Sequence, residues 1–271
     1  MSITKKYKNI LVSADKHLGL KIGDLDRTPD IVKNYRKVIS YLAKNKDTID
    51  AYVDLGDYFH NEKPNPEIYK IGIDLLYEID DIGVESFLLK GNHCGLKHGK
   101  TSLEPLKSIR FNNLRIIDDV TIISNLIFVP YMSKSDVAHS RRSEIEFVEN
   151  DPNLKYEKKR KMIENMLEPQ TYINRRIKEE CLTNKIEYAF CHLNCEGAEI
   201  PKTEYKIKQT SLSIPKYFFE KDTLKLVLNG HIHAHQKIGK VLCVGSIERG
   251  SFSEINDDKF CVLIQSDDDG N

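Results

Sequence analysis

Residues 51–60 read AYVDLGDYFH, an apolar run that ends in glycine, aspartate and histidine. The run predicts a buried strand over Ala51–Leu55, with Asp57 and His60 placed just beyond its end. Two flanking stretches repeat this design, ILVSADKH at 10–17 and FLLKGNH at 87–93. Apolar strands that end in polar, metal-ligating residue types indicate that the strand ends carry chemistry.

The segments between these strands have helical periodicity. A helix is predicted over 29–45, with Thr28 as its N-cap and Pro29 at its first position. A second helix over 64–82 is opened by Asn65 and Pro66 and stopped by Gly83. With strands at Lys8–Ala14, Ala51–Leu55 and Glu85–Lys90, the order is strand, helix, strand, helix, strand. This alternation predicts the α/β class, with a parallel sheet covered by helices.

The second half contains a different kind of segment. Short strands are predicted between Leu114 and Pro130, and residues from 134 to about 184 then form a charged helical pattern without strand signals. A basic cluster lies within it at Lys155, Lys158, Lys159, Arg160 and Lys161. We interpret this segment as a solvated helical insertion, with an arm that contacts substrate or a partner as the alternative. The whole is predicted as one domain over 1–265, followed by an acidic tail at 266–271.

Short strands return after the insertion and two of them end in histidines. YAFCH at 188–192 ends in His192, and LVLNGHIH at 226–233 ends in His231 and His233. In an open α/β sheet the carboxyl ends of the strands line the ligand crevice, so these residues can converge with those of the first half. Asp15 and His17 are two apart, so on an extended chain both side chains leave the same face. The glycines at 56, 91 and 230 precede candidate ligands and let the backbone turn at the strand ends.

The residue types suit a centre of two divalent ions. Such a pair, about 3.5–4 Å apart, can hold a phosphate and activate water between the ions. It needs carboxylate oxygens, one of them able to bridge, together with neutral imidazoles and an amide oxygen. A single D-x-H or H-x-H is a weak signal, but five strand ends with the same design predict a two-metal site. The other histidines, His98, His139 and His235, are interpreted as surface or packing residues.

The composition bears on nucleic-acid binding, the state of the cysteines and membrane association. Lys+Arg and Asp+Glu are both 41 in 271 residues, so the overall charge gives no support to unaided nucleic-acid binding. The six cysteines form no CxxC pair and are expected to be reduced thiols. No apolar run approaches the roughly 20 residues that cross a bilayer, and the first residues do not resemble a signal peptide. A cytoplasmic protein with no membrane association is expected.

In order, D-x-H, G-D-x-x-H, G-N-H, a lone histidine and G-H-x-H resemble the calcineurin-like metallophosphoesterase family. The resemblance implies a two-sheet sandwich flanked by helices, with both metals at the sheet edge. It implies that Asp15, His17 and His233 hold the first ion, that Asp57 bridges, and that Asn92, His192 and His231 hold the second. His93 would contact the phosphate or protonate the leaving oxygen. Manganese is the expected metal, with magnesium as the alternative.

Finer motifs resemble one branch of that family. Gly56-Asp57-Tyr58-Phe59-His60 lacks the acidic residue and arginine of the protein phosphatases and resembles the G-D-x-F-H of SbcD-type double-strand-break repair nucleases. In that branch the histidine matching His60 also serves catalysis. The stretches Gly197-Ala198-Glu199 and Gly245–Glu254 are similar to its H-x4-G-A-E and G-S-x-x-R-x-x-F-x-E. The resemblance implies a DNA exonuclease or endonuclease acting on ends or hairpins in repair or recombination. It also implies a homodimer and an ABC ATPase partner of the SbcC type.

Two departures and two alternatives accompany this prediction. The acid that the family carries after G-N-H is Cys94 here, which puts the orientation or basicity of His93 in doubt. Restoring an acid at this position is expected to preserve or raise activity. SbcD-type proteins continue into a DNA-capping domain and an ATPase-binding segment where this sequence stops, so it is either truncated or a compact version. The alternative functions are a small-nucleotide phosphodiesterase and a catalytically inactive scaffold with the same fold.

Overall fold

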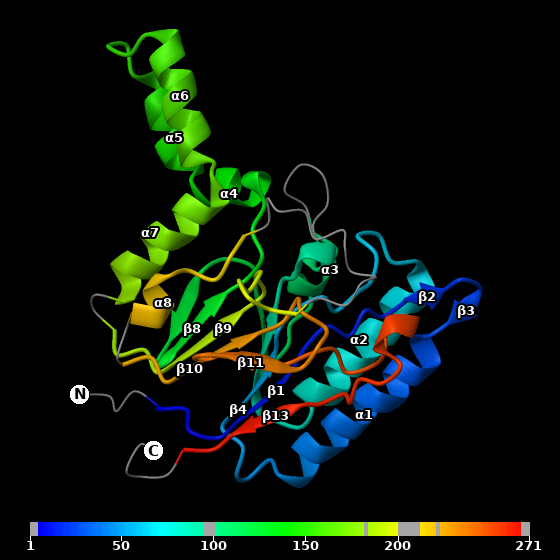
Figure 1. Cartoon of the computed structure of the whole chain (residues 1–271). Coiled ribbons are helices and arrows are strands. Elements are labelled where there is room, and N and C mark those ends of the chain that lie inside the picture. Colours follow the sequence, from blue (N-terminus) through cyan, green and yellow to red (C-terminus); the bar gives the residue numbers. More distant parts are fainter. Residues whose placement is uncertain (1–4, 95–100, 182–183, 200–211, 221–222, 267–271) are drawn as a thin grey trace.

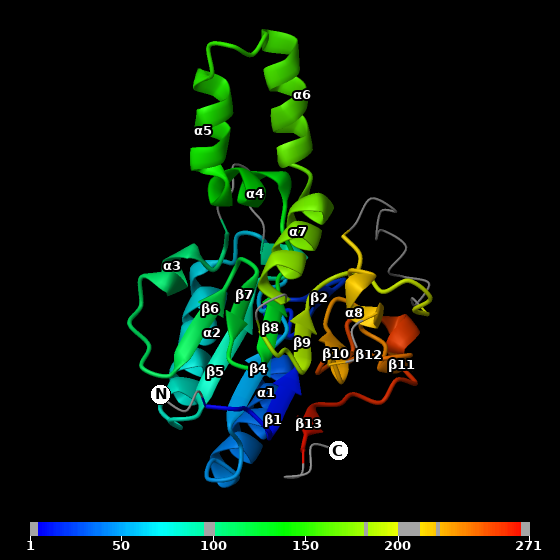
Figure 2. The same cartoon turned by 90° about the vertical axis from the view of Figure 1, so that its left-hand side faces the viewer.

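The computed structural model describes residues 5–94, 101–181, 184–199, 212–220 and 223–266. The tail predicted at 266–271, apart from Ser266, and His98 lie outside the described residues. Two β-sheets form the centre of the molecule, and helices cover their outer faces (Figures 1 and 2). The predicted two-sheet α/β sandwich is therefore confirmed.

The first sheet comes from the strand–helix alternation of the first half. In spatial order its strands are β13 (Val262–Ile264), β1 (Ile10–Ser13), β4 (Ala51–Asp54), β5 (Glu85–Leu89) and β6 (Leu114–Ile117). From β1 to β6 the neighbours are parallel, and β13 runs antiparallel to β1. The carboxyl ends of β1, β4 and β5 therefore meet at one edge of the sheet.

The second sheet is built mainly from the later short strands. In spatial order it contains β11 (Gln236–Ile238), β12 (Val241–Cys243), β10 (Leu226–Asn229), β9 (Tyr188–Cys191), β8 (Leu126–Val129) and β7 (Thr121–Ile123). Its central strands β8, β9, β10 and β12 are parallel, so β9 and β10 also deliver their carboxyl ends to one edge. A separate hairpin pairs β2 (Lys21–Ile22) with β3 (Leu25–Asp26).

Two helices cover the outer face of the first sheet. Helix α1 (Thr28–Lys44) buries Ile31, Tyr35 and Leu42, and α2 (Pro66–Asp80) buries Leu75, Leu76 and Ile79, all in one apolar cluster. As predicted, the side chain of Asn65 caps α2 by accepting the amide of Ile68 at 2.9 Å. The predicted cap of α1 is wrong, because Thr28 is the first helical residue. Asp26 accepts the Thr28 amide at 2.9 Å and so takes over that role from two residues upstream.

The helical segment after β8 has two parts. Its helices are α4 (Lys134–Ser140), α5 (Arg142–Asn150), α6 (Tyr156–Met166) and α7 (Pro169–Cys181). Helix α7 packs on the outer face of the second sheet through Tyr172, Ile173 and Ile177, where the short α8 (Tyr217–Glu220) contributes Phe218. Helices α5 and α6 lie side by side and project away from the body (Figures 1 and 2). Among the described residues, no helix is long and apolar enough to cross a bilayer.

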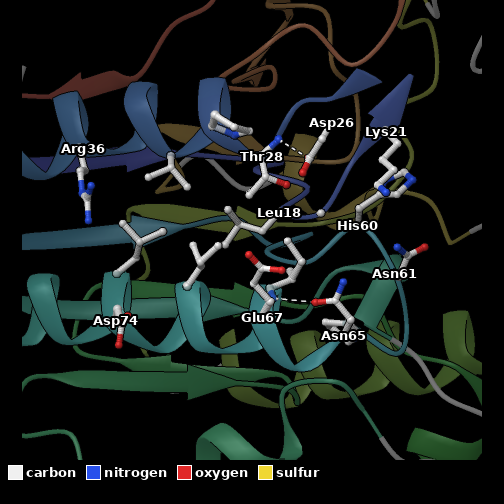
Figure 3. Close-up of a pocket in the computed structure, with 17 residues that line it drawn as sticks. Leu18, Lys21, Asp26, Thr28, Arg36, His60, Asn61, Asn65, Glu67 and Asp74 are labelled. Carbon is white, nitrogen blue, oxygen red and sulfur yellow. Dashed lines mark hydrogen bonds between the residues drawn. The ribbon is translucent and has the colours of Figure 1, made fainter. Parts of the chain in front are cut away.

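Between the sheets lies a third apolar layer. It packs Val12, Val53 and Phe87 of the first sheet against Phe128 and Phe190 of the second. Short helices complete the fold: α3 (Glu104–Lys107) and the 3-10 helices η1 (Asn92–Cys94) and η4 (Phe252–Glu254). A cavity of about 660 Å³ lies between α1 and α2, and His60 forms part of its wall (Figure 3).

Candidate metal centre

Both sheets contribute side chains to one centre. Ligand atoms of Asp15, His17 and His233 lie within 4.8 Å of one another, and we call these residues the first cluster. Ligand atoms of Asp57, His192 and His231 lie equally close and form the second cluster. The strands β1, β4, β9 and β10 end just before these residues, so the sandwich itself brings the two clusters together.

Asp57 lies between the clusters. Its Oδ2 is 3.8 Å from Nε2 of His17 in the first cluster and 3.4 Å from Nε2 of His192 in the second. Its Oδ1 accepts the backbone amide of His93 at 2.9 Å, which fixes the carboxylate and turns Oδ2 toward the imidazoles. This placement suits an oxygen that bridges two cations.

Asn92 completes the second cluster. Its Oδ1 lies 2.9 Å from Nε2 of His192 and 2.7 Å from Nδ1 of His231. In the first cluster, Nε2 of His17 and Nε2 of His233 are 3.0 Å apart. Two carboxylates, imidazoles and an amide oxygen thus converge with their lone pairs facing inward, a donor set that fits two divalent ions such as manganese.

The backbone at several strand ends is not extended, in contrast to the extended chain expected from the sequence for Asp15 and His17. Asp15 and His17 each have a φ of 52°, Asp57 has 49° and His231 has 71°, so these residues adopt the left-handed conformation and do not extend a strand. The predicted same-face argument for Asp15 and His17 is therefore wrong in its reason, although both side chains reach the first cluster. Such conformations cost about 1–3 kcal/mol each and persist where surrounding contacts impose them. Here the amides of Asp15 and His17 donate to the carbonyls of Gly56 (3.1 Å) and Asp57 (2.9 Å).

All three glycines at the centre lie where a Cβ would come too close to a neighbouring residue. A Cβ at Gly91 would clash with the carboxylate of Asp57, and one at Gly230 would lie 3.0 Å from Nδ1 of His192. Gly56 is the one of the three with a positive φ, 109°, and a Cβ there would lie 2.8 Å from the same nitrogen. The glycines therefore let neighbouring strand ends approach each other at the centre.

Hydrogen bonds behind the imidazoles fix which nitrogen faces the centre. Nδ1 of His192 donates to the carbonyl of Leu55 at 2.7 Å, which leaves Nε2 for a metal. Nε2 of His231 donates to Oδ1 of Asn194 at 3.0 Å, so Nδ1 is the nitrogen turned inward. The sequence patterns did not identify Asn194, and its position two residues after His192 is the one available signal.

Burial and charge set the protonation states. Burial lowers the pKa of His17 well below its usual value and that of His231 to about 3, so both present neutral imidazoles. Burial opposes ionisation of Asp57, but the positive charge of His192 and its hydrogen bond hold the pKa of Asp57 well below the usual range. Burial likewise disfavours the charged form of His192, yet Asp57 raises the pKa of this histidine to about 9. A divalent ion must displace the His192 proton in order to bind Nε2.

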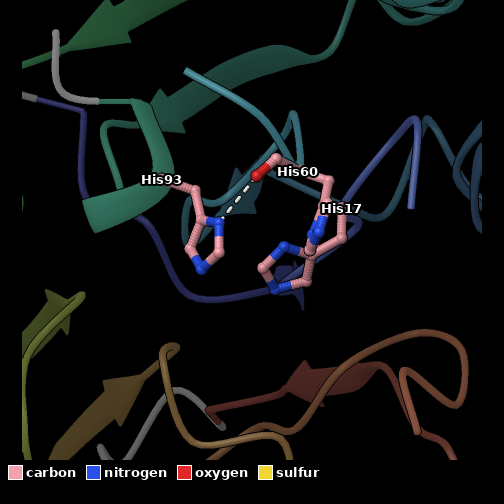
Figure 4. Close-up of side chains that lie close together, drawn as sticks. All are labelled: His17, His60 and His93. Carbon is pink, nitrogen blue, oxygen red and sulfur yellow. Dashed lines mark hydrogen bonds between the residues drawn. The ribbon is translucent and has the colours of Figure 1, made fainter. Parts of the chain in front are cut away.

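His60 and His93 lie beside the first cluster (Figure 4). Nδ1 of His93 donates to the backbone carbonyl of His60 at 2.7 Å, and the two rings are 5.3 Å apart between centroids. Nε2 of His93 lies 3.9 Å from Oδ2 of Asp57, and the side chain is about one-third exposed. The orientation of His93 therefore comes from a backbone carbonyl. Cys94 is fully buried in the apolar cluster under α1 and α2, and burial raises the pKa of its thiol to about 12.

A profile of the calcineurin-like phosphoesterase family matches residues 8–235, a segment that contains all the candidate site residues. The chain belongs to the calcineurin-like phosphoesterases. Its fold is similar to that of a dimetal phosphatase from Danio rerio, with a TM-score of 0.51 at 11% identity over 90% of this chain and 88% of that chain. It is also similar to the protein TT1561 of Thermus thermophilus, with a TM-score of 0.44 at 12% identity over 89% of this chain and 91% of that chain.

As a calcineurin-like phosphoesterase, the chain is expected to hydrolyse phosphoesters with divalent metals, and the converging Asp, His and Asn donors agree with that chemistry. Outside the centre, His235 packs against Phe260 with ring centroids 4.6 Å apart. Cys191 points away from His192 into the apolar layer under α7.

Proposed function

We propose that this calcineurin-like phosphoesterase is a metal-dependent DNA nuclease that cleaves phosphodiesters at DNA ends or hairpins in repair or recombination. The observation that carries the proposal is the pair His60 and His93 beside Asp57, with ring centroids 5.3 Å apart. A phosphodiester of DNA expels a sugar alkoxide, which is a poor leaving group and needs a proton as it departs. A histidine pair on the accessible side of the centre suits that need, and His60 lies in the motif that resembles SbcD-type nucleases.

In this proposal each group of site residues has its own role. Asp15, His17 and His233 would hold one ion, Asn92, His192 and His231 the other, and Asp57 would bridge them. When bound, two divalent ions supply the charge that stabilises the phosphoryl group in the transition state and activate the attacking water. His93 would deliver a proton from Nε2 to the leaving oxygen while Nδ1 keeps its bond to the carbonyl of His60. That bond fixes the ring, so the proton transfer needs no reorientation.

The ring of His60 has a separate part in the proposal. Burial, followed by the nearby charge of His93, lowers the pKa of His60 to about 4, so this ring is neutral at physiological pH. Its Nδ1 is buried and has no hydrogen-bond partner among the described residues, and its centroid lies 5.4 Å from that of His17. A neutral ring at this position can hydrogen-bond the substrate beside His93, and we assign it that supporting role.

A small-nucleotide phosphodiesterase is the second candidate, and one observation favours it. The cavity between α1 and α2 has about 660 Å³ and shares His60 with the catalytic side of the centre (Figure 3). Pockets of about 300–1,000 Å³ are typical for small ligands. A nucleotide with its phosphate at the metals and its base in this cavity would make this enzyme a phosphodiesterase for small molecules.

One assay separates the two candidates. Purified protein is given labelled duplex, single-stranded and hairpin DNA, cyclic and linear dinucleotides, and a generic aryl phosphodiester, each with manganese or magnesium. The nuclease proposal expects manganese-stimulated cleavage of DNA at a higher kcat/KM than any dinucleotide. The Asp57→Asn variant, purified in parallel, controls for contaminating nuclease. Preference for a dinucleotide with no cleavage of DNA would contradict the proposal.

The partners are also proposals. By its resemblance to the SbcD branch, the chain would act in the cytoplasm as a homodimer with an ABC ATPase of the SbcC type. The apolar stripes of α1 and α2 pack on the first sheet, so these stripes lend the dimer no support. Sedimentation equilibrium of the purified chain, with and without the candidate ATPase, tests both associations.

A further inference from the structure

A buried carboxylate lies directly behind the first cluster. Glu254, at the end of η4, is 1% exposed, and its Oε1 lies 3.5 Å from Nδ1 of His233. The same carboxylate accepts the backbone amide of Gly250 at 3.2 Å and the hydroxyl of Ser251 at 3.1 Å. Its other oxygen is paired with Nζ of Lys259 at 2.5 Å. Glu254 lies outside the segment that the family profile matches and has no role in the site as described above.

We propose that Glu254 is a positioning residue that holds His233 with its proton on Nδ1, so that Nε2 is the metal ligand of the first cluster. A neutral imidazole carries one ring proton, and the hydrogen bond made by one nitrogen decides which nitrogen keeps its lone pair. Nε2 of His233 already faces the centre, 3.0 Å from Nε2 of His17. The carboxylate on the far side therefore completes a carboxylate–histidine–metal arrangement.

Lys259 offsets the free-energy cost of burying the Glu254 carboxylate. An isolated ionised carboxylate in the interior is costly, but a close cation and several donors offset that cost. Here Nζ of Lys259, the amide of Gly250 and the hydroxyl of Ser251 supply that compensation. Lys259 also donates to the backbone carbonyl of His233 at 3.3 Å and to Oγ of Ser246 at 2.9 Å. Glu254 thus contacts the ring of His233, and Lys259 contacts its backbone.

The competing explanation is that Glu254 only neutralises Lys259. Two variants separate the explanations: Glu254→Gln, and Glu254→Gln combined with Lys259→Met, in which no unpaired cation is left. Glu248→Gln is the matched control, because Glu248 lies in the same loop and pairs with Arg27 at 3.2 Å away from the metal ligands. The inference rests on the two-metal centre of the proposed function, and not on DNA as the substrate.

The measurement is a manganese titration of the metal-free variants by calorimetry. Both Glu254 variants should bind one of two manganese ions about 10–100-fold more weakly, as loss of such a partner typically does, and the other ion as the wild type does. Glu254→Asp should recover part of the loss. Nitrogen-15 histidine spectra of metal-free protein should show the proton of His233 on Nδ1 in the wild type and spread over both nitrogens in Glu254→Gln.

Three results would overturn the inference. They are wild-type affinity for both ions in Glu254→Gln, equal weakening of both ions, or full recovery of affinity in the double variant. The last would assign Glu254 to charge neutralisation alone. If the Glu254 variants bind one manganese ion more weakly and the other normally, but the wild type cleaves no DNA, the nuclease proposal is wrong and the inference about Glu254 still holds.

Discussion

Among single residues, Asp57 connects the two clusters. Its Oδ2 faces imidazoles of both, and its Oδ1 is held by the amide of His93. Because Asp57 is 2% exposed, its carboxylate is largely shielded from solvent. A substitution here acts on both proposed ions at once, unlike a substitution at a terminal ligand.

Asp57→Asn should therefore lose metal and activity together. The change removes a negative charge that both cations need and places an amide nitrogen among imidazoles. Lewis-acid stabilisation by such ions is worth several kcal/mol, so turnover should fall by about 10³-fold or more. Metal content after dialysis, measured by mass spectrometry beside the phosphodiesterase rate, checks it. Wild-type turnover with full metal occupancy would rule out the two-metal interpretation.

His93→Gln should separate chemistry from metal binding. Asn92 and not His93 supplies the ligand atom, and the bond to Asp57 comes from the backbone amide, which glutamine retains. Proton transfer by a placed side chain is worth about 10²–10⁴-fold, and the rate should drop by that factor with both ions still bound. His60→Ser keeps the carbonyl that orients His93, so it should lower nuclease activity while preserving the metals. Loss of metal from the His93 variant would make this histidine a ligand.

Cys94→Asp now has a different expectation from the one that the motif alone suggests. The side chain is fully buried among apolar residues, and His93 already has its partner in the carbonyl of His60. A buried carboxylate without a counter-charge typically costs about 3–5 kcal/mol. The free energy of unfolding should fall by that order in urea titration, whereas Cys94→Ala should cost clearly less. An unchanged unfolding midpoint with faster turnover would restore the expectation from the motif.

At the scale of elements, one largely buried ion pair joins the loop after β5, which leads to Asn92, to the helical segment. Nζ of Lys90, the residue after β5, lies 2.7 Å from Oδ1 of Asp136 in α4. Asp136 also forms the capping box of α4 with Ser133, and the carbonyl of Lys90 accepts the amide of Tyr131 at 3.0 Å. The start of α4 is therefore fixed to the edge of the metal centre.

Removing either charge of the Lys90–Asp136 pair should lower the free energy of unfolding, and the two losses should not be additive. Asp136→Asn leaves Lys90 buried without its counter-charge, which typically costs about 3–5 kcal/mol. Lys90→Met strands the carboxylate instead, and the double variant removes both charges. Urea unfolding of the metal-free proteins should give a double variant more stable than the sum of the single losses implies. Strict additivity would mean that the two side chains act independently.

The elements that the sequence predicts are those with a long apolar pattern. The strands before Asp15, Asp57, Asn92, His192 and His231 are all found, because each is a run of buried residues. The strands β2 (KI), β3 (LD) and β11 (QKI) are short and contain one apolar residue each, so they show no apolar run. Left-handed backbone at Asp15 and His17 is imposed by carbonyls of Gly56 and Asp57, which are distant in sequence. Contacts of this kind leave no local signal.

For the whole molecule, charge decides how it would meet DNA. Lys+Arg and Asp+Glu balance at 41 each, so there is no global attraction to a polyanion. The exposed basic side chains of α6 include Lys158, Arg160 and Lys161, but Arg160 pairs with Glu164 at 3.3 Å. The overall charge therefore supplies no attraction to DNA, and electrostatic binding would depend on local basic patches.

The isolated chain should accordingly bind duplex DNA weakly, with a Kd of about 1 µM or above, and the affinity should fall steeply with salt. Each neutralised phosphate contributes a slope of about −0.9 in log K against log salt, because its counterions are released. A salt titration of duplex binding by fluorescence anisotropy measures the slope directly. Replacing Lys158, Arg160 and Lys161 by alanine should make the slope less steep if α5 and α6 contact DNA. Replacing Lys33, Lys37 and Lys44 of α1 is the control for the loss of charge alone. An ATPase partner should tighten binding by adding a linked second site. Tight binding by the lone chain that ignores salt would show that its affinity comes from contacts other than phosphates.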